Sequence, residues 1–366
     1  MTMETLPVLL LMCQSANSFS TILRQPSQIH HSTAAVWQHR FQSAVFCFGS
    51  SSVVIREKAK TYISRSRPEM SKHALIGGGT GFIGRNLAKN LSQKGYDVTV
   101  ISRMPGPKRI TWHELEKNGI PSSITAVVNA TGQNVLDATR RWTPGFQQNV
   151  WNSRINSSKT LAQAMKAAPK VTSFVNLCGV SHYPPSESKV YTEEDKVSGF
   201  DYMSKLCLAW EEAAKTGDEQ DCKCTILRTG VVVGHGGGMI QSIWLPFKLG
   251  VGGPLGSGQQ IMPWIHMQDL CSLIQHIIEK PVPGVVNAVA PEIASNKEFS
   301  KAFAKAINRP CIFNVPEFVV HAIFGKERAA LLLSGAKVKP QTAISSGFKF
   351  QYPTVKEAVT ELTRKG

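Results

Sequence analysis

The sequence predicts an α/β fold: a doubly wound parallel sheet with helices on both faces and a smaller α+β lobe at its C-terminal end. Two observations support this prediction. From residue 73 onward, short apolar runs alternate with amphipathic helical patterns, as they do in parallel sheets. The first apolar run also ends in a glycine-rich turn, residues 77–84, that leads directly into a helical pattern. A strand, a glycine turn and a helix in this order are typical of the Rossmann-type fold.

The glycine-rich turn predicts a dinucleotide site. Two frames overlap in it, Gly79-x-Gly81-x-x-Gly84 and Gly78-x-x-Gly81-x-x-Gly84. Glycine is needed where the turn adopts positive φ and where a pyrophosphate approaches bare backbone. The phosphates are then expected on the amides and the positive dipole end of the helix. The contacts predicted in this turn are Gly78, Gly79, Thr80, Gly81, Phe82, Ile83 and Gly84.

The end of the second predicted strand favours NADP over NAD. In NAD enzymes an Asp or Glu near this position binds the ribose hydroxyls. Here Asp97 begins the strand, and the strand ends in Ser102 and Arg103. A guanidinium beside a hydroxyl suits the 2′-phosphate of NADP, which a carboxylate would repel. The alternative is that Arg103 is a solvated loop arginine.

A third segment is expected to form another wall of the same pocket. Asn129, Ala130 and Thr131 end a later apolar strand and are followed by Gly132. Small residues there let the backbone approach a cofactor, and Asn129 can satisfy neighbouring strand ends. Taken alone, this segment is only a turn pattern.

The remaining elements follow from hydrophobic periodicity and capping residues. Near-continuous apolar runs in the fourth and fifth strands indicate burial on both faces. Past Pro254, a helix opened by Asn296 as N-cap is expected near the start of the last lobe. The predicted strands are 73–76, 97–102, 125–129, 173–178, 224–233 and 285–288, and the predicted helices are 82–93, 145–168, 201–215, 239–249 and 268–279.

Three segments are predicted along the chain of 366 residues. Residues 1–69 are rich in Ser and Arg and poor in acids, which is typical of a disordered or transit-like extension. Met70 lies just before the first strand, so an alternative start there is equally compatible, and location is left open between mitochondrial and cytoplasmic. Residues 70–289 are predicted to form the NADP-binding domain, with substrate-lobe insertions near 236–263, and residues 290–366 a C-terminal substrate lobe.

Composition restricts the classes of partner. The net charge is +16, but no basic run after the glycine turn exceeds a pair, so we interpret the charge as a solvated surface and expect no nucleic acid partner. The eight cysteines show no zinc spacing, and no metal is expected. No apolar run reaches the ~18 residues of a membrane span, so no membrane partner is expected. A small-molecule substrate is expected, and a homo-oligomer is possible.

From residue 70 onward, the sequence resembles the short-chain dehydrogenase/reductase superfamily, in its extended, epimerase-like branch, and within it the atypical group called epimerase family proteins. The most specific matches lie in the second half of the chain. The resemblance implies an NADP-binding Rossmann fold with a C-terminal lobe, and cofactor contacts at Asn149 and Arg154. The segments that carry it are 77–84, 102–103, 128–132, 228–232, 252–258, 263–269 and 347–353.

The chemistry that this resemblance implies is incomplete here. Active members use Tyr-x-x-x-Lys, in which the Lys lowers the pKa of the Tyr, and an upstream Ser or Thr. No Tyr-x-x-x-Lys is present: Tyr202 is followed at that spacing by Leu206, and Lys205 comes one residue early. If the protein is an enzyme, we expect the proton donor to be Tyr183 or Tyr191, in the loop after the fourth strand, although either can equally be a packing residue.

Three functions therefore remain open. The first is an NADP-dependent oxidoreductase acting on an unknown small carbonyl or alcohol substrate with a non-standard active site. The second is a non-catalytic NADPH-binding regulatory or scaffold protein. The third is a nucleotide-sugar epimerase, which normally needs the missing Tyr and Lys pair. Active-site roles, not the fold, must decide among them.

Overall fold

The computed structural model describes residues 72–216 and 222–364. Within them, seven parallel strands form one sheet in the order β10-β7-β5-β4-β1-β2-β3. These strands are β1 (His73–Gly77), β2 (Asp97–Ser102), β3 (Arg109–Thr111), β4 (Ala126–Asn129), β5 (Ser173–Gly179), β7 (Lys223–Thr229) and β10 (Gly284–Ala288). The predicted doubly wound parallel sheet is confirmed. Strand order reverses between β1 and β4, and such a switch point is where open α/β sheets bind ligands.

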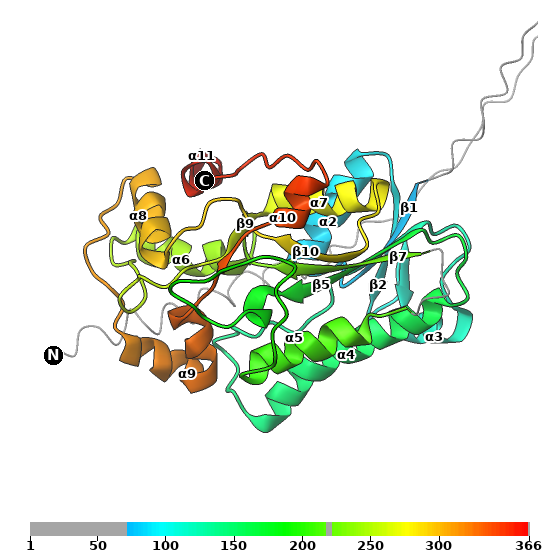
Figure 1. The fold of residues 1–366 in the computed structure, drawn as a ribbon, viewed down its shortest axis with the longest axis horizontal. Coiled ribbons are helices and arrows are strands. Elements are labelled where there is room, and N and C mark those ends of the chain that lie inside the picture. Colours follow the sequence, from blue (N-terminus) through cyan, green and yellow to red (C-terminus); the bar gives the residue numbers. More distant parts are fainter. Residues whose placement is uncertain (1–71, 217–221, 365–366) are drawn as a thin grey trace, which may run out of the picture. The chain divides into compact units, whose positions relative to one another are not determined.

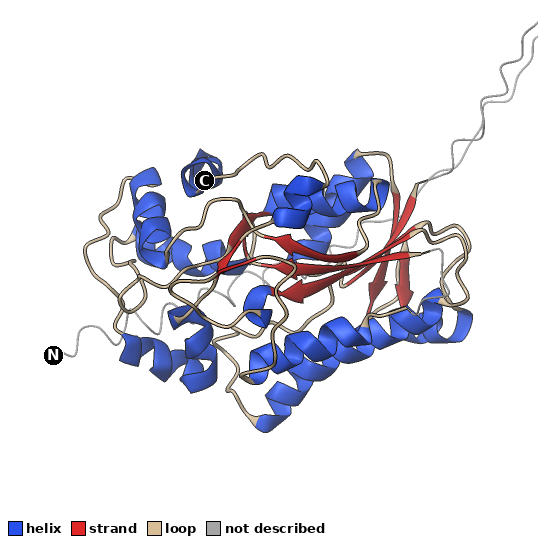
Figure 2. Cartoon of the chain, in the orientation of Figure 1, coloured by secondary structure: helices blue, strands red, loops and turns tan. Residues whose placement is uncertain are grey.

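Helices cover both faces of the sheet, as Figures 1 and 2 show. One face packs against α2 (Phe82–Gln93), α7 (Met267–Glu279) and α10 (Gln341–Ser345). The other packs against α3 (Trp112–Asn118), α4 (Pro144–Met165) and α5 (Tyr202–Ala213). Phe174 and Val175 of β5 are fully buried, because adjacent residues of a strand point to opposite faces and both faces are covered.

A separate apolar core lies beyond the carboxyl ends of the strands. The pair β8 (Val231–Val233) and β9 (Trp264–His266) packs there with α6 (Gly238–Lys248), α8 (Asn296–Ala306) and α11 (Val355–Arg364). The predicted insertion at 236–263 thus supplies a helix to the same core as the C-terminal residues. The domain boundary at residue 289 stays a prediction, and the predicted extension at 1–69 lies outside the described residues.

The other described elements are short or broken. A second parallel pair joins β6 (Val190–Tyr191) to β11 (Lys337–Val338), and a 3-10 turn, η1 (Val180–His182), follows β5. Helix α9 (Glu317–Leu333) is interrupted at Gly325, whose φ is 75°. That positive φ favours glycine and breaks the helical path.

Two predicted elements differ from the structure. The run 224–233 is two strands, because the chain leaves the main sheet at Gly230. A Cβ there would lie 2.7 Å from the carbonyl oxygen of Pro263, so only glycine allows the change of sheet without displacement. The N-cap of α8 is Ser295, not Asn296, since Ser295 and Glu298 form a reciprocal capping box.

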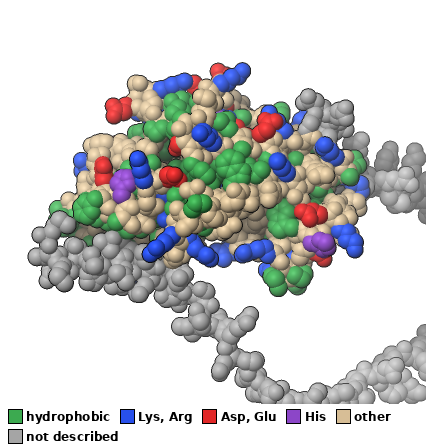
Figure 3. Space-filling view, turned by 90° about the horizontal axis from the view of Figure 1, so that it is seen from below, with side chains coloured by type: hydrophobic (Ala, Val, Ile, Leu, Met, Phe, Trp, Pro, Cys, Tyr) green, Lys and Arg blue, Asp and Glu red, His purple; other side chains and the backbone are tan. Residues whose placement is uncertain are grey.

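Charge on the surface is dispersed. On the face seen in Figure 3, Lys and Arg side chains lie at many separate places with Asp and Glu among them. No helix within 72–216 and 222–364 is long and apolar enough to cross a membrane. The same residues contain no group of three or more His, Cys, Asp or Glu side chains arranged to hold a metal ion.

Candidate functional site

The glycine turn between β1 and α2 is shaped by close backbone contacts. Gly78 has φ of 73°, and a Cβ on it would lie 2.7 Å from the carbonyl oxygen of Ala130. The amide of Gly81 donates to the Gly78 carbonyl at 2.9 Å. The turn therefore lies directly against the end of β4, and a side chain at Gly78 would push the two segments apart.

The other two glycines of the turn permit tight packing on either side. A Cβ on Gly79 would lie 2.5 Å from a methyl carbon of Val100 in β2. A Cβ on Gly84 would lie 2.3 Å from the Gly78 carbonyl oxygen. Without these side chains, α2 can begin immediately beneath the turn, which is the role expected of the last glycine in such a turn.

The N-terminus of α2 has the properties of an anion site. Gly81 is its N-cap, no side chain caps the helix, and its first turn contains no acidic residue. The first amides of a helix have no partner within the helix, and the dipole there favours negative charge. Thr80 and Gly81 are exposed, whereas Phe82 and Ile83 are half-buried.

Around this turn, the structure brings together the carboxyl ends of three strands. Gly77 of β1 lies in register with Ile101 of β2 and with Asn129 of β4. Because these strands are parallel and adjacent, Arg103 and Thr131 follow at the same edge of the sheet. The segments that the sequence assigns to one pocket therefore do lie beside one another.

No acidic side chain ends β2. Asp97 lies at the opposite end of that strand, where its carboxylate pairs with Lys108 at 2.6 Å. Ser102 is buried, and its hydroxyl contacts the backbone of Met104. Arg103 is exposed, and no hydrogen bond or ion pair engages its side chain within 72–216 and 222–364. This arrangement leaves an exposed cation, and no carboxylate, at the end of β2, which is the position that distinguishes NADP from NAD in this fold.

Asn129 supports the site from beneath. It is fully buried, and its amide group donates to Asn176 at 2.8 Å and to Ser158 at 3.0 Å. Its oxygen accepts from the amide of Thr131 at 3.2 Å. The side chain of Asn129 therefore joins β4, β5 and α4 and sets the course of the backbone at Ala130 and Thr131.

Two polar groups beside the end of β4 could contact a ligand: the Thr131 hydroxyl and the Arg154 guanidinium, which donates to the Val150 carbonyl at 3.0 Å and lies over the Trp210 ring. The Thr131 hydroxyl is buried and, within the described chain, has no hydrogen-bond partner. Arg154 on α4 lies against Gly132, with two guanidinium atoms 3.1 Å from where a Cβ would be. Burial lowers the pKa of Arg154, and no carboxylate among the described residues pairs with it. Asn149, on the same helix, is exposed.

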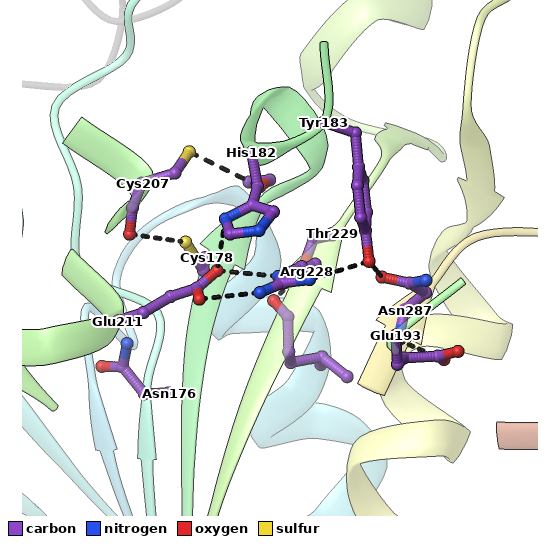
Figure 4. Close-up of polar contacts among 12 residues, drawn as sticks. Asn176, Cys178, His182, Tyr183, Glu193, Cys207, Glu211, Arg228, Thr229 and Asn287 are labelled. Carbon is purple, nitrogen blue, oxygen red and sulfur yellow. Dashed lines mark hydrogen bonds and ion pairs between the residues drawn. The ribbon is translucent and has the colours of Figure 1, made fainter. Parts of the chain in front are cut away.

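Tyr183 is held in a buried polar network at the ends of β5, β7 and β10 (Figure 4). Its hydroxyl accepts from Arg228 at 2.8 Å and lies 2.9 Å from both the Asn287 side-chain oxygen and the Thr192 carbonyl. Arg228 in turn donates two hydrogen bonds to Glu211, at 2.8 and 2.9 Å. Burial raises the pKa of Tyr183. The network positions this hydroxyl rigidly, and its role as a proton donor stays a prediction.

The second predicted donor, Tyr191, packs beside the first. Its ring stacks on Tyr183 with centroids 5.1 Å apart, and the Lys189 ammonium lies over its ring at 4.8 Å from the centroid. Tyr191 is 4% exposed. Its catalytic role also stays a prediction.

The geometry of α5 agrees with the missing Tyr and Lys pair. The Tyr202 hydroxyl donates to the Gln147 carbonyl at 2.7 Å. Leu206, one turn further, is buried, whereas Lys205 is exposed. The lysine therefore points away from Tyr202, as its position one residue early in the helix requires.

Sequence reasoning missed part of this network. Glu211 of α5 is not identifiable from the sequence as the partner of Arg228, yet it accepts two hydrogen bonds from that side chain. Asn287 and Glu193 were not singled out, although Glu193 accepts from the amides of Asn287 at 2.9 Å and Thr342 at 3.1 Å. An arginine inside the apolar run of β7 was the available signal, because a buried charge requires a buried partner.

Comparison with known proteins places this geometry in a family. Residues 74–289 match the NAD dependent epimerase/dehydratase family. The chain belongs to that family. Residues 315–362 match a domain of unknown function, DUF1731, which covers α9, α10 and most of α11.

Family members with full-length similarity come from animals and bacteria. Epimerase family protein SDR39U1 of Bos taurus is 43% identical over 79% of this chain and 98% of its own length. An epimerase family protein of Mycobacterium tuberculosis is 32% identical over 79% of this chain and 97% of its own. The crystal structure of human epimerase family protein SDR39U1 with NADPH has a TM-score of 0.79, at 42% identity over 80% of this chain and all of that one.

Proposed function

We propose that this chain binds NADP(H) at the edge formed by β1, β2 and β4. The observation that carries the proposal is the convergence there of a glycine-rich turn, a helix N-terminus without a side-chain cap, and two arginines without carboxylate partners. The amides of 78–84 would hold the pyrophosphate, Arg103 with Ser102 the 2′-phosphate, and Thr131 with Arg154 further polar groups. The human relative crystallised with NADPH supports the same assignment.

We propose further that the protein is an NADP-dependent oxidoreductase acting on a small carbonyl or alcohol. The bound nicotinamide would supply the hydride. What the chain must add is an acid that protonates the substrate oxygen. Tyr183 and Tyr191 are the proposed donors. Arg228 donates to the Tyr183 hydroxyl at 2.8 Å, so it would stabilise the phenolate that remains after Tyr183 has given up its proton.

One observation favours a second candidate, a non-catalytic NADPH-binding protein. The Tyr183 hydroxyl already has three polar neighbours, and Lys205 points to solvent. A protein that keeps its cofactor turn but has no free acid would bind NADPH without consuming it.

The names of the family and of its members favour a third candidate, epimerisation of a nucleotide sugar, in which the cofactor is regenerated in each cycle.

Turnover separates these candidates. NADPH oxidation should be followed spectrophotometrically with a panel of aldehydes and ketones, and nucleotide sugars should be assayed separately for a change of configuration. The oxidoreductase proposal expects stoichiometric NADPH loss with at least one carbonyl compound. Tyr183→Phe or Tyr191→Phe should then lower kcat by about 10²–10⁴-fold, the usual effect of losing a general acid.

Two results would contradict the proposal. If NADPH binds but no carbonyl compound is turned over, the non-catalytic NADPH-binding protein becomes the better candidate. If turnover occurs and both Phe variants keep full kcat while Arg154→Ala loses cofactor affinity, the cofactor assignment holds but the tyrosine mechanism is wrong.

A further inference from the structure

Two neighbouring loops expose an apolar patch far from the glycine turn in sequence. The patch consists of Leu249, Val251, Ile312 and Phe313, whose side chains are 60%, 43%, 74% and 65% exposed. Solvated apolar residues are common singly. Four of them on two touching loops are unusual, and exposed apolar clusters typically mark interaction sites.

Backbone contacts hold the two loops together. A Cβ on Gly253 would lie 1.8 Å from the carbonyl oxygen of Phe313, and one on Gly250 would lie 3.4 Å from Pro310. The Val315 amide donates to the Pro254 carbonyl at 2.7 Å, and the Gly256 amide donates to the Val315 carbonyl at 2.8 Å. These contacts hold the two loops side by side, so the four apolar side chains lie on one surface.

Basic residues predominate around the patch. The segments that carry it and lead into it, residues 239–254 and 299–316, contain no Asp or Glu. They contain four basic residues, all exposed: Lys248, Lys301, Lys305 and Arg309. Two exposed acids, Glu298 and Glu317, border the second segment. Such a surface is complementary to a negatively charged one and repels a second copy of itself.

We propose that this patch docks on the surface of an anionic lipid bilayer. The apolar side chains would enter the boundary between headgroups and acyl chains, and the four basic residues would contact the phosphates. Apolar insertion combined with basic attraction gives the two weak signals that together hold a protein at a membrane. This mode needs no spanning helix, because the chain would lie on the bilayer and not cross it.

Vesicle cosedimentation of the full chain tests the proposal. The protein is mixed with phosphatidylcholine vesicles, either pure or containing about one-third phosphatidylserine, at low and at high salt. We expect binding to the anionic vesicles that falls with salt, as electrostatic attraction to a charged surface does. The Ile312→Ser/Phe313→Ser variant should bind at least tenfold more weakly than the unsubstituted chain.

Matched variants keep the test specific. Lys248→Gln/Arg309→Gln should weaken binding about fivefold for each charge removed, whereas Lys166→Gln/Lys170→Gln, with the same net charge on exposed residues of another region, should not. Met104→Ser removes an equally exposed apolar residue elsewhere and should bind normally. Residues 1–71 are the same in all variants, so their contribution cancels in each comparison.

Three outcomes would overturn the proposal. The first is no preference for anionic vesicles. The second is equal binding of the Ile312→Ser/Phe313→Ser variant and the unsubstituted chain, with unchanged melting temperatures. The third is a dimer that becomes monomeric on the same double substitution, which would assign the patch to self-association.

Discussion

At the residue scale, the buried side chain of His182 makes the stability of the fold depend on pH. It lies on η1, is 3% exposed, and approaches Glu211 with its Nδ1 at 3.3 Å. Burial lowers the pKa of His182 to about 4, with Arg228 acting in the same direction and Glu211 opposing it. The ring is therefore neutral in the folded protein at pH values where the unfolded chain already carries a charge there.

The sign of the pH effect follows from this difference. Because the unfolded His182 binds a proton near pH 6.5 and the folded one near pH 4, stability is lost as the pH falls between these values. From pH 7 to pH 5 this group should lower the free energy of unfolding by about 2 kcal/mol. Urea unfolding of wild type and His182→Gln at both pH values measures the difference.

A matched substitution controls for general acid effects. His113 is exposed, so His113→Gln should show the same pH dependence as wild type, whereas His182→Gln should show a smaller one. If His182→Gln loses as much stability on acidification as wild type, the assignment of this pH dependence to His182 is wrong.

At the scale of elements, the contact between the glycine turn and α2 leaves no space for a side chain. The Gly84 position leaves no room for a Cβ beside the Gly78 carbonyl, and the obstructing atom is backbone. Gly84→Ala should therefore displace α2, lower the free energy of unfolding by about 1–3 kcal/mol and weaken NADPH binding at least tenfold.

Gly145, in the first turn of α4, offers a matched control. A Cβ there would meet no atom within 4 Å, so Gly145→Ala should leave melting temperature and NADPH affinity near the wild-type values. Thermal melts and calorimetric titration of both variants provide the comparison. Normal NADPH affinity in Gly84→Ala would show that the turn tolerates a side chain and does not shape the cofactor site.

Much of this element-level structure could be predicted from sequence. Strand β2 and helix α2 have the predicted ends, because each is bounded by a strong local pattern of polar and glycine residues. The break at Gly230 could not be predicted, since Val231–Val233 are as apolar as β7 and only tertiary pairing with β9 separates them. The three-residue β3 and the seven-residue α3 could not be predicted, because elements this short have almost no periodicity.

The candidate site shows the same division. The glycine turn and Arg103 lie close together in the sequence and are recognised by a local pattern, so the sequence alone could predict them. The network of Tyr183, Arg228 and Asn287 joins residues that are 45 and 104 positions apart. No spacing rule predicts such contacts, and only the buried charge of Arg228 hinted at one.

At the scale of the whole molecule, Arg328 ties α9 to the loop that follows β4. Its side chain is 2% exposed. It donates to the carbonyls of Asp137 at 2.8 Å and Phe324 at 2.7 Å, and it lies over the ring of Trp142. Trp142 also donates from its indole nitrogen to Glu327. The loop after β4 begins beside Thr131, so α9 and the predicted cofactor pocket are joined through these contacts.

Removing this tie should affect stability and binding together. Arg328→Ala leaves two carbonyls without their donors at a cost of about 1–3 kcal/mol each, and we expect a melting temperature about 4–8 °C lower with severalfold weaker NADPH binding. Arg140→Ala, an exposed arginine in the same loop, should behave as wild type. Identical melting of Arg328→Ala and wild type would show that α9 does not depend on this contact.

The measurement that tests the account most directly is calorimetric titration of the full chain with NADPH and with NADH. The account predicts at least tenfold tighter binding of NADPH, a difference of ~1.4 kcal/mol. It also predicts that Arg103→Ala removes most of this preference, because we propose that Arg103, at the end of a strand without a carboxylate, binds the 2′-phosphate. Equal affinities for the two cofactors, or a preference that Arg103→Ala leaves unchanged, would contradict it.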